Sequence, residues 1–252
     1  MDFLGKMYGA ALQRAVQLDV PHGPAPEVRP FGQILRDMAL IAEVKYATPA
    51  DGFLGITDAP EVIAREYERL GAAAVSCLTE PDYFAGSLEY IPRIRSACSL
   101  PVMMKDFIAH ERQLRAGRAL GADACLLITE MLDLGELRAL YACCLDLGMD
   151  CLVEVHGPAG LDKACAVGAR VIGVNCRDLA TLKVDPSRHE ELIGQMPEGV
   201  ITVAESGITS GARLRELRAM GYDAALIGRA FAGRECREEI FHVGQDLRHH
   251  PA

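Results

Sequence analysis

The stretch LGADACLLI (residues 120–128) contains the unit that decides the fold, because this unit recurs along the chain. A helix-like segment precedes its glycine, and an apolar, strand-like run follows. The same phrase begins again at Leu70, Val167 and Met220. A glycine just past a helix can take the left-handed conformation that ends the helix. Each repeat therefore indicates a junction from a helix to a strand.

Apolar runs of strand length can be counted outward from these junctions, with amphipathic stretches such as 60–70 and 133–147 between them. Continuous Val/Ile/Leu runs are typical of parallel strands that are buried on both faces. Eight β-then-α units in a chain of 252 residues predict an α/β fold, the (β/α)8 TIM barrel. The predicted strands lie near residues 39–45, 73–78, 101–105, 124–128, 151–155, 171–175, 201–205 and 224–228.

A doubly wound open sheet is the alternative fold. It usually has fewer strands and a glycine-rich first turn, whereas no G-x-G-x-x-G motif occurs in this chain. Residues 1–38 precede the first strand and contain one amphipathic helix, followed by a proline-rich link. We predict a single barrel domain over residues 1–252, with residues 1–38 as an N-terminal helical extension that caps it.

The charge balance is acidic, with 26 Lys and Arg against 35 Asp and Glu and a net charge of −9. A protein that binds nucleic acid needs a basic face, so no nucleic-acid partner is predicted. A small anionic substrate remains compatible, because it needs only a local cationic pocket. Nothing in the sequence predicts an oligomeric state.

The nine cysteines form no C-x-x-C pair and no Cys/His cluster with zinc spacing. This pattern predicts free thiols in a reducing cytoplasm and no metal site. The N-terminus lacks the continuous apolar core of a signal peptide. No apolar run reaches the ~18 residues that a membrane span needs, so no membrane association is expected.

Charged residues stand at the ends of several predicted strands, which is where such barrels place their working groups. One charge at a strand end ordinarily meets water, and a lone Lys–Glu pair is ordinarily structural. Several such ends converge if they point inward, and buried charges need partners. Two lysines facing three glutamates meet that need and shift one another's pKa values, as general acid–base chemistry requires. The residues are Glu43, Lys45, Lys105, Glu154, Asn175, Arg177 and Glu205.

The ends of the seventh and eighth strands predict an anion site. Ser206 and Gly207 precede a helix that begins near Ser210, and Gly228 precedes another helix. Glycines let backbone N–H groups approach an anion, and the N-terminus of a helix favours negative charge. Tight turns are the alternative explanation for both glycines. A phosphorylated substrate fits better, because it would reach from this site to the lysines.

The chain resembles the indole-3-glycerol phosphate synthase family. Glu43-Val44-Lys45 followed by Thr48-Pro49 is similar to that family's Glu-x-Lys-x-x-Ser-Pro-Ser signature. Its remaining signatures are matched in order and spacing over residues 39–230 by LTEPDYFAGS, PVMMKDFI, LVEVH, GVNCRDL and VAESGI. The resemblance implies a carboxy-lyase of tryptophan biosynthesis that needs no cofactor. Its substrate would be 1-(2-carboxyphenylamino)-1-deoxyribulose 5-phosphate, which undergoes ring closure, decarboxylation and dehydration.

The resemblance also implies catalytic roles. Lys105 matches the acid that protonates the substrate's carbonyl oxygen, and Glu154 matches the base. Lys45 matches a second lysine, near the substrate carboxylate and the leaving hydroxyl. Glu43 and Asn175 would orient the lysines and the ribulose hydroxyls.

The remaining residues implied by the resemblance would bind the substrate. Arg177, Glu205 and Ser206 would line the mouth of the site, and Thr48 keeps a hydroxyl of the Ser-Pro-Ser loop. An apolar wall for the anthranilate ring would consist of Phe84, Phe107 and Leu126, for which core packing alone is the alternative role. The phosphate would lie among Lys45, Gly207 and Gly228, with Arg229 beside it.

Some positions depart from the family pattern. Ala50 replaces the second serine of the loop, and Arg229 follows Gly228 where the family often has serine. These departures leave open a paralogue that acts on a related phosphorylated sugar amine. His156 is expected in a loop role instead of at the site. Asp106 is expected to point away from the site, to the outer layer or to a loop amide.

Three other functions remain as alternatives. In a Schiff-base aldolase, Lys105 or Lys45 would be the nucleophile. A phosphoribosylanthranilate isomerase would be expected to use a Cys/Asp pair, which is not seen at the ends of the first and sixth strands. A catalytically inactive phosphate-ligand binding subunit would need a broken acid–base set, and here the set is intact.

Overall fold

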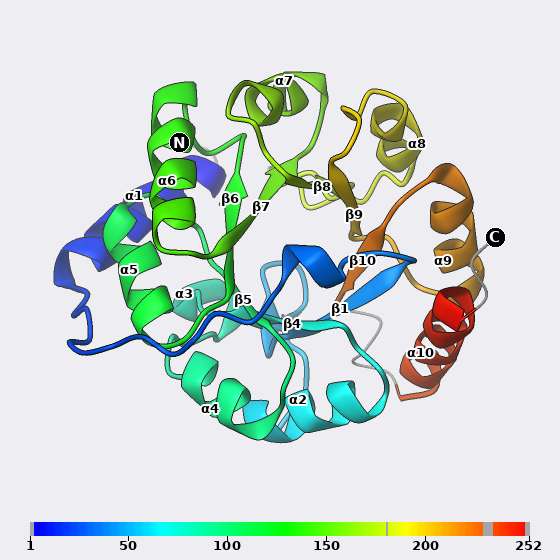
Figure 1. The fold of residues 1–252 in the computed structure, drawn as a ribbon, viewed down its shortest axis with the longest axis horizontal. Coiled ribbons are helices and arrows are strands. Elements are labelled where there is room, and N and C mark those ends of the chain that lie inside the picture. Colours follow the sequence, from blue (N-terminus) through cyan, green and yellow to red (C-terminus); the bar gives the residue numbers. More distant parts are fainter. Residues whose placement is uncertain (1–2, 180, 229–233, 250–252) are drawn as a thin grey trace.

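The computed structural model describes residues 3–179, 181–228 and 234–249, and within these ranges eight parallel strands close into a barrel (Figure 1). The predicted (β/α)8 TIM barrel is confirmed, and each strand begins and ends within one residue of its predicted bounds. The strands are β1 (Ala39–Val44), β4 (Ala74–Leu78), β5 (Val102–Lys105), β6 (Ala124–Ile128), β7 (Asp150–Val155), β8 (Val171–Asn175), β9 (Ile201–Glu205) and β10 (Ala224–Ile227). β1 pairs with both β4 and β10, which closes the ring.

Helices surround the strands on the outside (Figure 1). The helices of this outer layer are α2 (Pro60–Arg69), α4 (Tyr90–Ala97), α5 (Glu111–Ala119), α6 (Leu134–Asp146), α7 (Pro158–Ala166), α8 (Ser187–Ile193), α9 (Gly211–Met220) and α10 (Arg234–His249). The repeated glycines end helices as predicted, because Gly71, Gly121, Gly168 and Gly221 all have positive φ.

Shorter elements are inserted between strands and helices. A small hairpin of β2 (Ala47–Thr48) and β3 (Gly52–Phe53) follows β1, and α3 (Pro81–Phe84) follows β4. Both insertions come after the C-terminal ends of their strands, so they lie at the end of the barrel where catalytic groups are expected.

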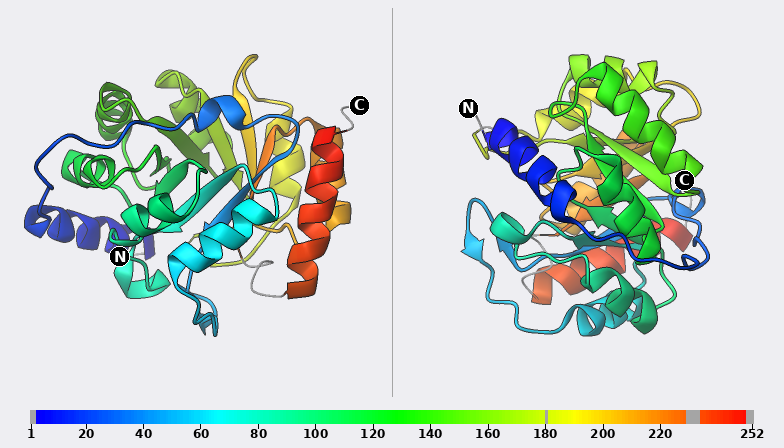
Figure 2. Two further views of the ribbon diagram at one scale, coloured as in Figure 1. Left: turned by 60° about the horizontal axis from the view of Figure 1, so that its bottom comes forward. Right: turned by 90° about the vertical axis from the view of Figure 1, so that its left-hand side faces the viewer.

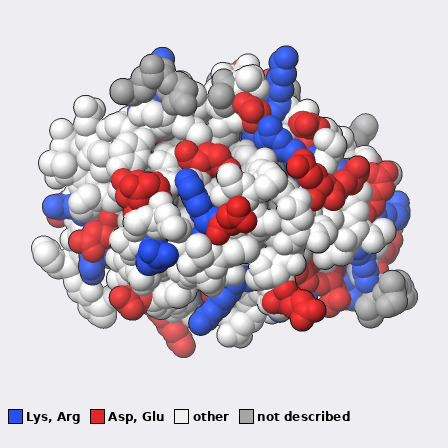
Figure 3. Space-filling view, turned by 90° about the horizontal axis from the view of Figure 1, so that it is seen from above, with Lys and Arg blue, Asp and Glu red and all other residues white. Residues whose placement is uncertain are grey.

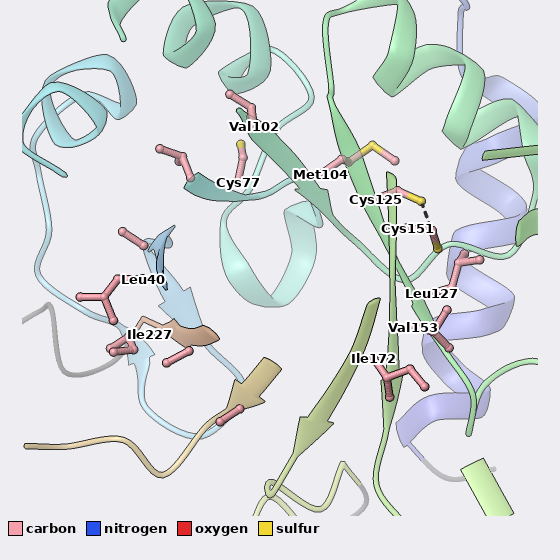
Figure 4. Packing of buried hydrophobic residues seen from close by; sticks show 14 of the residues in the cluster. Leu40, Cys77, Val102, Met104, Cys125, Leu127, Cys151, Val153, Ile172 and Ile227 are labelled. Atoms are coloured by element: carbon pink, nitrogen blue, oxygen red, sulfur yellow. Dashed lines mark hydrogen bonds between the residues drawn. The ribbon is translucent and has the colours of Figure 1, made fainter. Parts of the chain in front are cut away.

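Apolar side chains fill two layers because successive strand residues point to opposite faces. One set packs between the strands and the helices, as Leu40, Met104 and Leu127 do in Figure 4. The other set fills the interior of the barrel and includes Ile41 and Met103, the neighbours of Leu40 and Met104. Each of these buried side chains contributes about 1.5–3 kcal/mol to folding.

The N-terminal segment contacts both ends of the barrel. Helix α1 (Phe3–Gln17) lies outside the barrel wall, beside α5 (Figure 2). The chain then reaches the opposite end, where the backbone N–H of Arg29 donates to Asp123 Oδ1 at 2.7 Å. There Phe31 and Leu35 are fully buried among the apolar residues of the barrel interior, beside η1 (Gly32–Ile34).

The helices within the described ranges are all too short or too polar to span a bilayer. Acidic and basic side chains lie interspersed on the face shown in Figure 3. The expected lack of a nucleic-acid partner stays a prediction.

Candidate active site

The alternation of the strands brings the predicted catalytic residues into the barrel. On several strands an inward apolar residue is followed two positions later by an inward polar one, because the side-chain period of a strand is two. The apolar members belong to the interior cluster, and the polar members line one cavity at the C-terminal ends of the strands. The pairs are Ile41 and Glu43, Met103 and Lys105, Leu152 and Glu154, and Val203 and Glu205, and on β10 the inward Leu226 is followed by Gly228, which has no side chain.

This cavity has a volume of about 450 Å³ and collects most of the predicted site. Thr48 lies in a smaller hollow beside it, which shares Lys45 and Arg177 with the main cavity. Arg229 lies outside the described residues. The predicted residues that line the main cavity are Glu43, Lys45, Phe84, Lys105, Phe107, Leu126, Glu154, Asn175, Arg177, Glu205, Ser206, Gly207 and Gly228.

Glu43 bridges the two lysines. One carboxylate oxygen, Oε1, lies 2.5 Å from Lys45 Nζ, and the other, Oε2, lies 2.9 Å from Lys105 Nζ. Burial alone would raise the pKa of this fully buried carboxyl. The charges of Lys105 and Lys45 outweigh the burial and lower the pKa of Glu43 to about 2. Glu43 is therefore ionised at neutral pH and holds both ammonium groups in place.

Lys105 faces more than one carboxylate. Its Nζ lies 3.7 Å from Glu205 Oε2, in addition to its contact with Glu43. Burial alone would lower the pKa of Lys105, but the charges of Glu43, Glu205 and Glu154 outweigh it and raise this pKa above its ordinary value. Lys105 thus carries a proton at neutral pH, which is the state that a general acid needs.

Glu205 and Glu154 are two buried carboxyl groups on different strands. Burial and the charge of Glu154 raise the pKa of Glu205 well above its ordinary range. Two close carboxyl groups in a low-dielectric site cannot both ionise easily, so one of them keeps a proton. Glu205 therefore keeps a proton to a higher pH than an ordinary carboxyl group does.

Asn175 and Arg177 are fixed at the edge of the cavity. The side-chain oxygen of Asn175 accepts a hydrogen bond from the backbone N–H of Arg177 at 2.9 Å. The guanidinium of Arg177 donates to the carbonyl oxygen of Leu182, also at 2.9 Å. Asn175 pairs with Glu205 across β8 and β9, so the two side chains stand side by side.

The backbone after β9 and at the end of β10 leaves room for another group to approach it closely. Ser206 and Gly207 both have positive φ, at 65° and 67°. This conformation is unusual for serine. Ser210 caps α9 by accepting from the backbone N–H of Arg213 at 3.3 Å. A Cβ atom at Gly228 would lie 2.2 Å from Glu43 Oε1, so only glycine leaves room for that carboxylate.

Aromatic side chains form one wall of the cavity. The rings of Phe84 and Phe107 lie 6.2 Å apart, and Phe107 also meets the ring of Phe3 from α1 edge to face at 5.9 Å. The predicted wall is therefore assembled from α3 (Phe84), the loop after β5 (Phe107) and β6 (Leu126), and the N-terminal helix packs against it through Phe3.

Asp106 binds a loop amide, as expected, but it also lines the cavity instead of lying away from it. It accepts hydrogen bonds from the Thr79 hydroxyl and from the backbone N–H of Phe107, each at 2.8 Å. The sequence did not predict its third partner, Arg14 of α1, whose guanidinium donates to it at 2.9 Å. Burial raises the pKa of Asp106 to about 6 although Arg14 opposes this.

His156 lies in the loop after β7, as expected, and does not line the cavity, but its ring contacts a residue of the site. Its ring lies behind the cavity, with Nε2 3.4 Å from Glu154 Oε1 and Nδ1 2.8 Å from Glu130 Oε2. The available signal was its spacing, because His156 stands two residues after Glu154 and therefore faces the same side. No pattern in the sequence pointed to Glu130, which follows a different strand.

The fold also gathers three cysteines that are far apart in sequence. The Sγ atoms of Cys125, Cys144 and Cys151 lie within 4.8 Å of one another, between β6, β7 and α6 (Figure 4). Hydrogen bonding with Cys144 and burial raise the pKa of Cys125, and burial raises that of Cys151, whereas hydrogen bonding with these two thiols lowers the pKa of Cys144. Cys125 and Cys151 are therefore neutral buried thiols, which pack as small apolar groups. The trio belongs to the outer layer and does not line the cavity.

Comparison with known proteins agrees with this geometry. Residues 10–242 match the sequence profile of the family described as indole-3-glycerol phosphate synthase. The chain belongs to the indole-3-glycerol phosphate synthase family. A relative of that name from Micrococcus luteus is 45% identical over 200 residues, which cover 79% of this chain and 75% of the relative. Another, from Acetivibrio thermocellus, is 43% identical over 205 residues, covering 81% of this chain and 79% of the relative.

Solved structures outside the indole-3-glycerol phosphate synthase family share the fold. One is described as KGPDC from Streptococcus mutans, with a TM-score of 0.63, 11% identity and coverage of 84% of this chain and 97% of the other. Another is an N-acetylmannosamine-6-phosphate 2-epimerase from Clostridium perfringens, with a TM-score of 0.60, 13% identity and coverage of 83% and 93%. At these identities the likeness concerns the barrel alone.

Proposed function

We propose that the chain is an indole-3-glycerol phosphate synthase, a carboxy-lyase of tryptophan biosynthesis. Its substrate is 1-(2-carboxyphenylamino)-1-deoxyribulose 5-phosphate, and its product is indole-3-glycerol phosphate. The observation that carries the proposal is the cluster in which Glu43 holds Lys45 and Lys105 at the C-terminal ends of the strands, opposite Glu154 and Glu205. Family membership supports the choice of substrate.

Lys105 acts as the acid in ring closure. The ring carbon that bears the carboxylate attacks the ribulose carbonyl carbon, and the carbonyl oxygen takes the proton of Lys105. The new carbon–carbon bond places the carboxylate on a saturated carbon, so loss of carbon dioxide returns the electron pair to the ring and restores aromaticity. The raised pKa of Lys105 keeps this proton available at neutral pH.

Dehydration follows with a second acid and a base. Lys45 protonates the departing hydroxyl, and Glu154 removes a proton from the adjacent carbon, so water leaves and the pyrrole double bond forms. Asn175, Arg177 and Glu205 orient the ribulose hydroxyls at the edge of the cavity. Phe84, Phe107 and Leu126 hold the aromatic ring.

The phosphate binds at the ends of β9 and β10. The Ser206–Gly207 turn and Gly228 leave room for backbone N–H groups to approach it, and the capped N-terminus of α9 lies nearby. The ammonium of Lys45, 13% exposed, supplies the opposing charge. Thr48 and Ala50 line the adjoining hollow, which is where a paralogue with a different sugar amine would differ.

The electrostatics of the cavity speak against a Schiff-base aldolase. A nucleophilic lysine must lose its proton, which a lowered pKa favours. Lys105 instead has its pKa raised by three carboxylates. Borohydride treatment in the presence of substrate should therefore trap no adduct.

Fluorescence of the indole product tests the proposal directly. Purified protein is mixed with 1-(2-carboxyphenylamino)-1-deoxyribulose 5-phosphate, with Lys105→Ala and Lys6→Ala in parallel. Lys6 is exposed on α1 and serves as the control. We expect turnover in the wild type and in Lys6→Ala, and its loss in Lys105→Ala. A folded wild type that forms no indole would overturn the assignment and favour the paralogue.

A further inference from the structure

A carboxylate, an imidazole and a second carboxylate form a chain behind the cavity. His156 directly follows β7, and Glu130 follows β6 after Thr129. Glu130 holds His156 twice, because Oε1 accepts from the His156 backbone N–H at 3.0 Å and Oε2 lies 2.8 Å from Nδ1. The other ring nitrogen, Nε2, lies 3.4 Å from Glu154 Oε1.

The contact with Glu130 fixes the state of the imidazole. Because a carboxylate can only accept at that distance, Nδ1 must carry a proton. Nε2 then faces the carboxyl of Glu154 and is buried without a hydrogen-bond partner among the described residues. A lone pair on Nε2 would repel an ionised Glu154, whereas an N–H there would attract it. The arrangement therefore favours an imidazolium, whose positive charge attracts the carboxylate of Glu154 across 3.4 Å without a formed hydrogen bond.

The surrounding charges favour that imidazolium. Burial alone would lower the pKa of His156, but hydrogen bonding to Glu130 and the charge of Glu154 raise it in spite of opposition from Arg188 of α8. Burial likewise acts against ionisation of Glu130, yet His156 lowers the pKa of Glu130. On α7, the ammonium of Lys163 is engaged with the backbone carbonyl oxygens of residues 129 and 132, at 2.8 and 2.9 Å.

We propose that His156, fixed by Glu130, is the positioning residue that holds the carboxyl of Glu154 aimed at the substrate. This inference rests on the proposed function, because it deepens the role of Glu154 as the base. It also distinguishes two neighbouring carboxyl groups. His156 contacts Glu154 at 3.4 Å, whereas burial and the charge of Glu154 raise the pKa of Glu205, so Glu205 is the carboxyl that keeps a proton.

The exposed fractions of the three side chains indicate that His156, held by Glu130, contacts Glu154 on the side away from the cavity. Glu154 is 2% exposed and His156 is 8% exposed, whereas Glu130 is 29% exposed. Neither Glu130 nor His156 lines the cavity. A substrate would therefore contact Glu154 while His156 remains on the far side, and no substrate group would replace the imidazole as the partner of Oε1.

Steady-state kinetics across pH test the proposal with His156→Asn and Glu130→Gln. His156→Asn should lower kcat about 10-fold to 100-fold and change KM less than about 3-fold. The acid limb of its kcat profile should move to higher pH, because the carboxylate of Glu154 loses the positive charge beside it. Glu130→Gln keeps an acceptor for Nδ1 but removes a charge, so the alkaline limb, where His156 loses its proton, should move to lower pH.

A histidine-to-asparagine control and a direct titration separate the outcomes. His242 is 77% exposed on α10, so His242→Asn should match the wild type in kcat and in both limbs. NMR titration of the imidazole signals should give His156 a midpoint above the ordinary histidine value of about 6.5, and Glu130→Gln should lower that midpoint.

Several results would overturn the proposal. An active wild type together with His156→Asn that keeps both its kcat and its pH limbs would show that His156 does not act on Glu154. A variant that loses thermal stability and kcat while its limbs stay in place would show a purely structural role. A wild type that does not turn over this substrate is a different failure, because it refutes the proposed function while the NMR titration still decides whether His156 has the predicted charge.

Discussion

The bridge from Glu43 to both lysines predicts a specific acid lability. The pKa of Glu43 is about 2 in the folded chain, against an ordinary value of 4.5. Protonation of this carboxyl therefore removes its favourable interactions with Lys45 and Lys105. At about 1.4 kcal/mol per pKa unit, this difference corresponds to roughly 3 kcal/mol of folding free energy. Because the folded pKa is the lower one, this stabilisation is complete above about pH 4.5 and declines as the pH falls towards 2.

Glu43→Gln removes the titrating carboxyl. The difference between the pH profiles of unfolding free energy for the wild type and Glu43→Gln therefore isolates the contribution of Glu43. Urea unfolding is followed from pH 6 to pH 3 by tyrosine fluorescence and far-UV circular dichroism, since the chain has 7 tyrosines and no tryptophan. The wild type should lose about 2 kcal/mol more than Glu43→Gln between pH 4.5 and pH 3. Glu89→Gln, at an exposed position, should follow the wild type. Parallel curves for the wild type and Glu43→Gln would refute the electrostatic reasoning.

Three further substitutions test other parts of the structure. Gly173→Ala would place a Cβ atom 2.1 Å from Glu205 Oε1, so it should displace that carboxyl and lower kcat/KM at least about 100-fold in the fluorescence assay. Arg14→Met removes the cation beside the buried Asp106, and urea unfolding at pH 7 should show a loss of about 1–3 kcal/mol. Cys165 is the exposed member of the nine free cysteines, so Cys165→Ala should abolish the fast phase of the reaction with a thiol reagent.

Each of these substitutions has a contradicting outcome. A Gly173→Ala enzyme with unchanged kcat/KM would mean that Glu205 can move without consequence, and Gly9→Ala, where a Cβ atom meets nothing within 4 Å, is its control. An Arg14→Met protein as stable as the wild type would mean that α1 does not neutralise Asp106. A fast thiol phase that survives Cys165→Ala would mean that another cysteine, such as the half-buried Cys143 or Cys236, reacts equally fast.

The strands were predictable because each carries its own signal. A parallel strand of the barrel is buried on both faces, so a run such as ACLLI at residues 124–128 is apolar throughout and can be recognised without knowledge of its neighbours. The glycines at 71, 121, 168 and 221 mark the helix ends for an equally local reason, since each adopts a positive φ there. Closure of the ring follows once the number of units is known.

The site was predictable as far as strand alternation reaches. Glu43, Lys105 and Glu154 follow inward apolar residues by two positions, so their convergence could be argued from the sequence. Contacts between distant loops leave no periodic pattern in the sequence, so they could not be predicted in this way. Glu130 meets His156 only because β6 and β7 are neighbours, and Arg14 meets Asp106 only because α1 lies beside the barrel.

That residues 1–38 form a single domain with the barrel remains a prediction. Arg14 joins the extension to one end of the barrel, and Arg29 and Phe31 join it to the other. If the extension and the barrel form a single domain, both probes of unfolding should report one coincident transition.

The division of labour in the cavity follows from how many carboxylates each ammonium faces. Lys105 faces Glu43, Glu205 and Glu154, so its proton is held firmly and is released only to a strong base such as the oxygen of a carbonyl under attack. Lys45 contacts Glu43 alone among these carboxyl groups and also lines the adjoining hollow, where a phosphate or a departing hydroxyl can reach it. Glu154 has the imidazole of His156 3.4 Å away, whereas Glu205 has a raised pKa. The same buried charges that would be costly alone thus stabilise one another and acquire different proton affinities, so acid and base can act in one cavity at one pH.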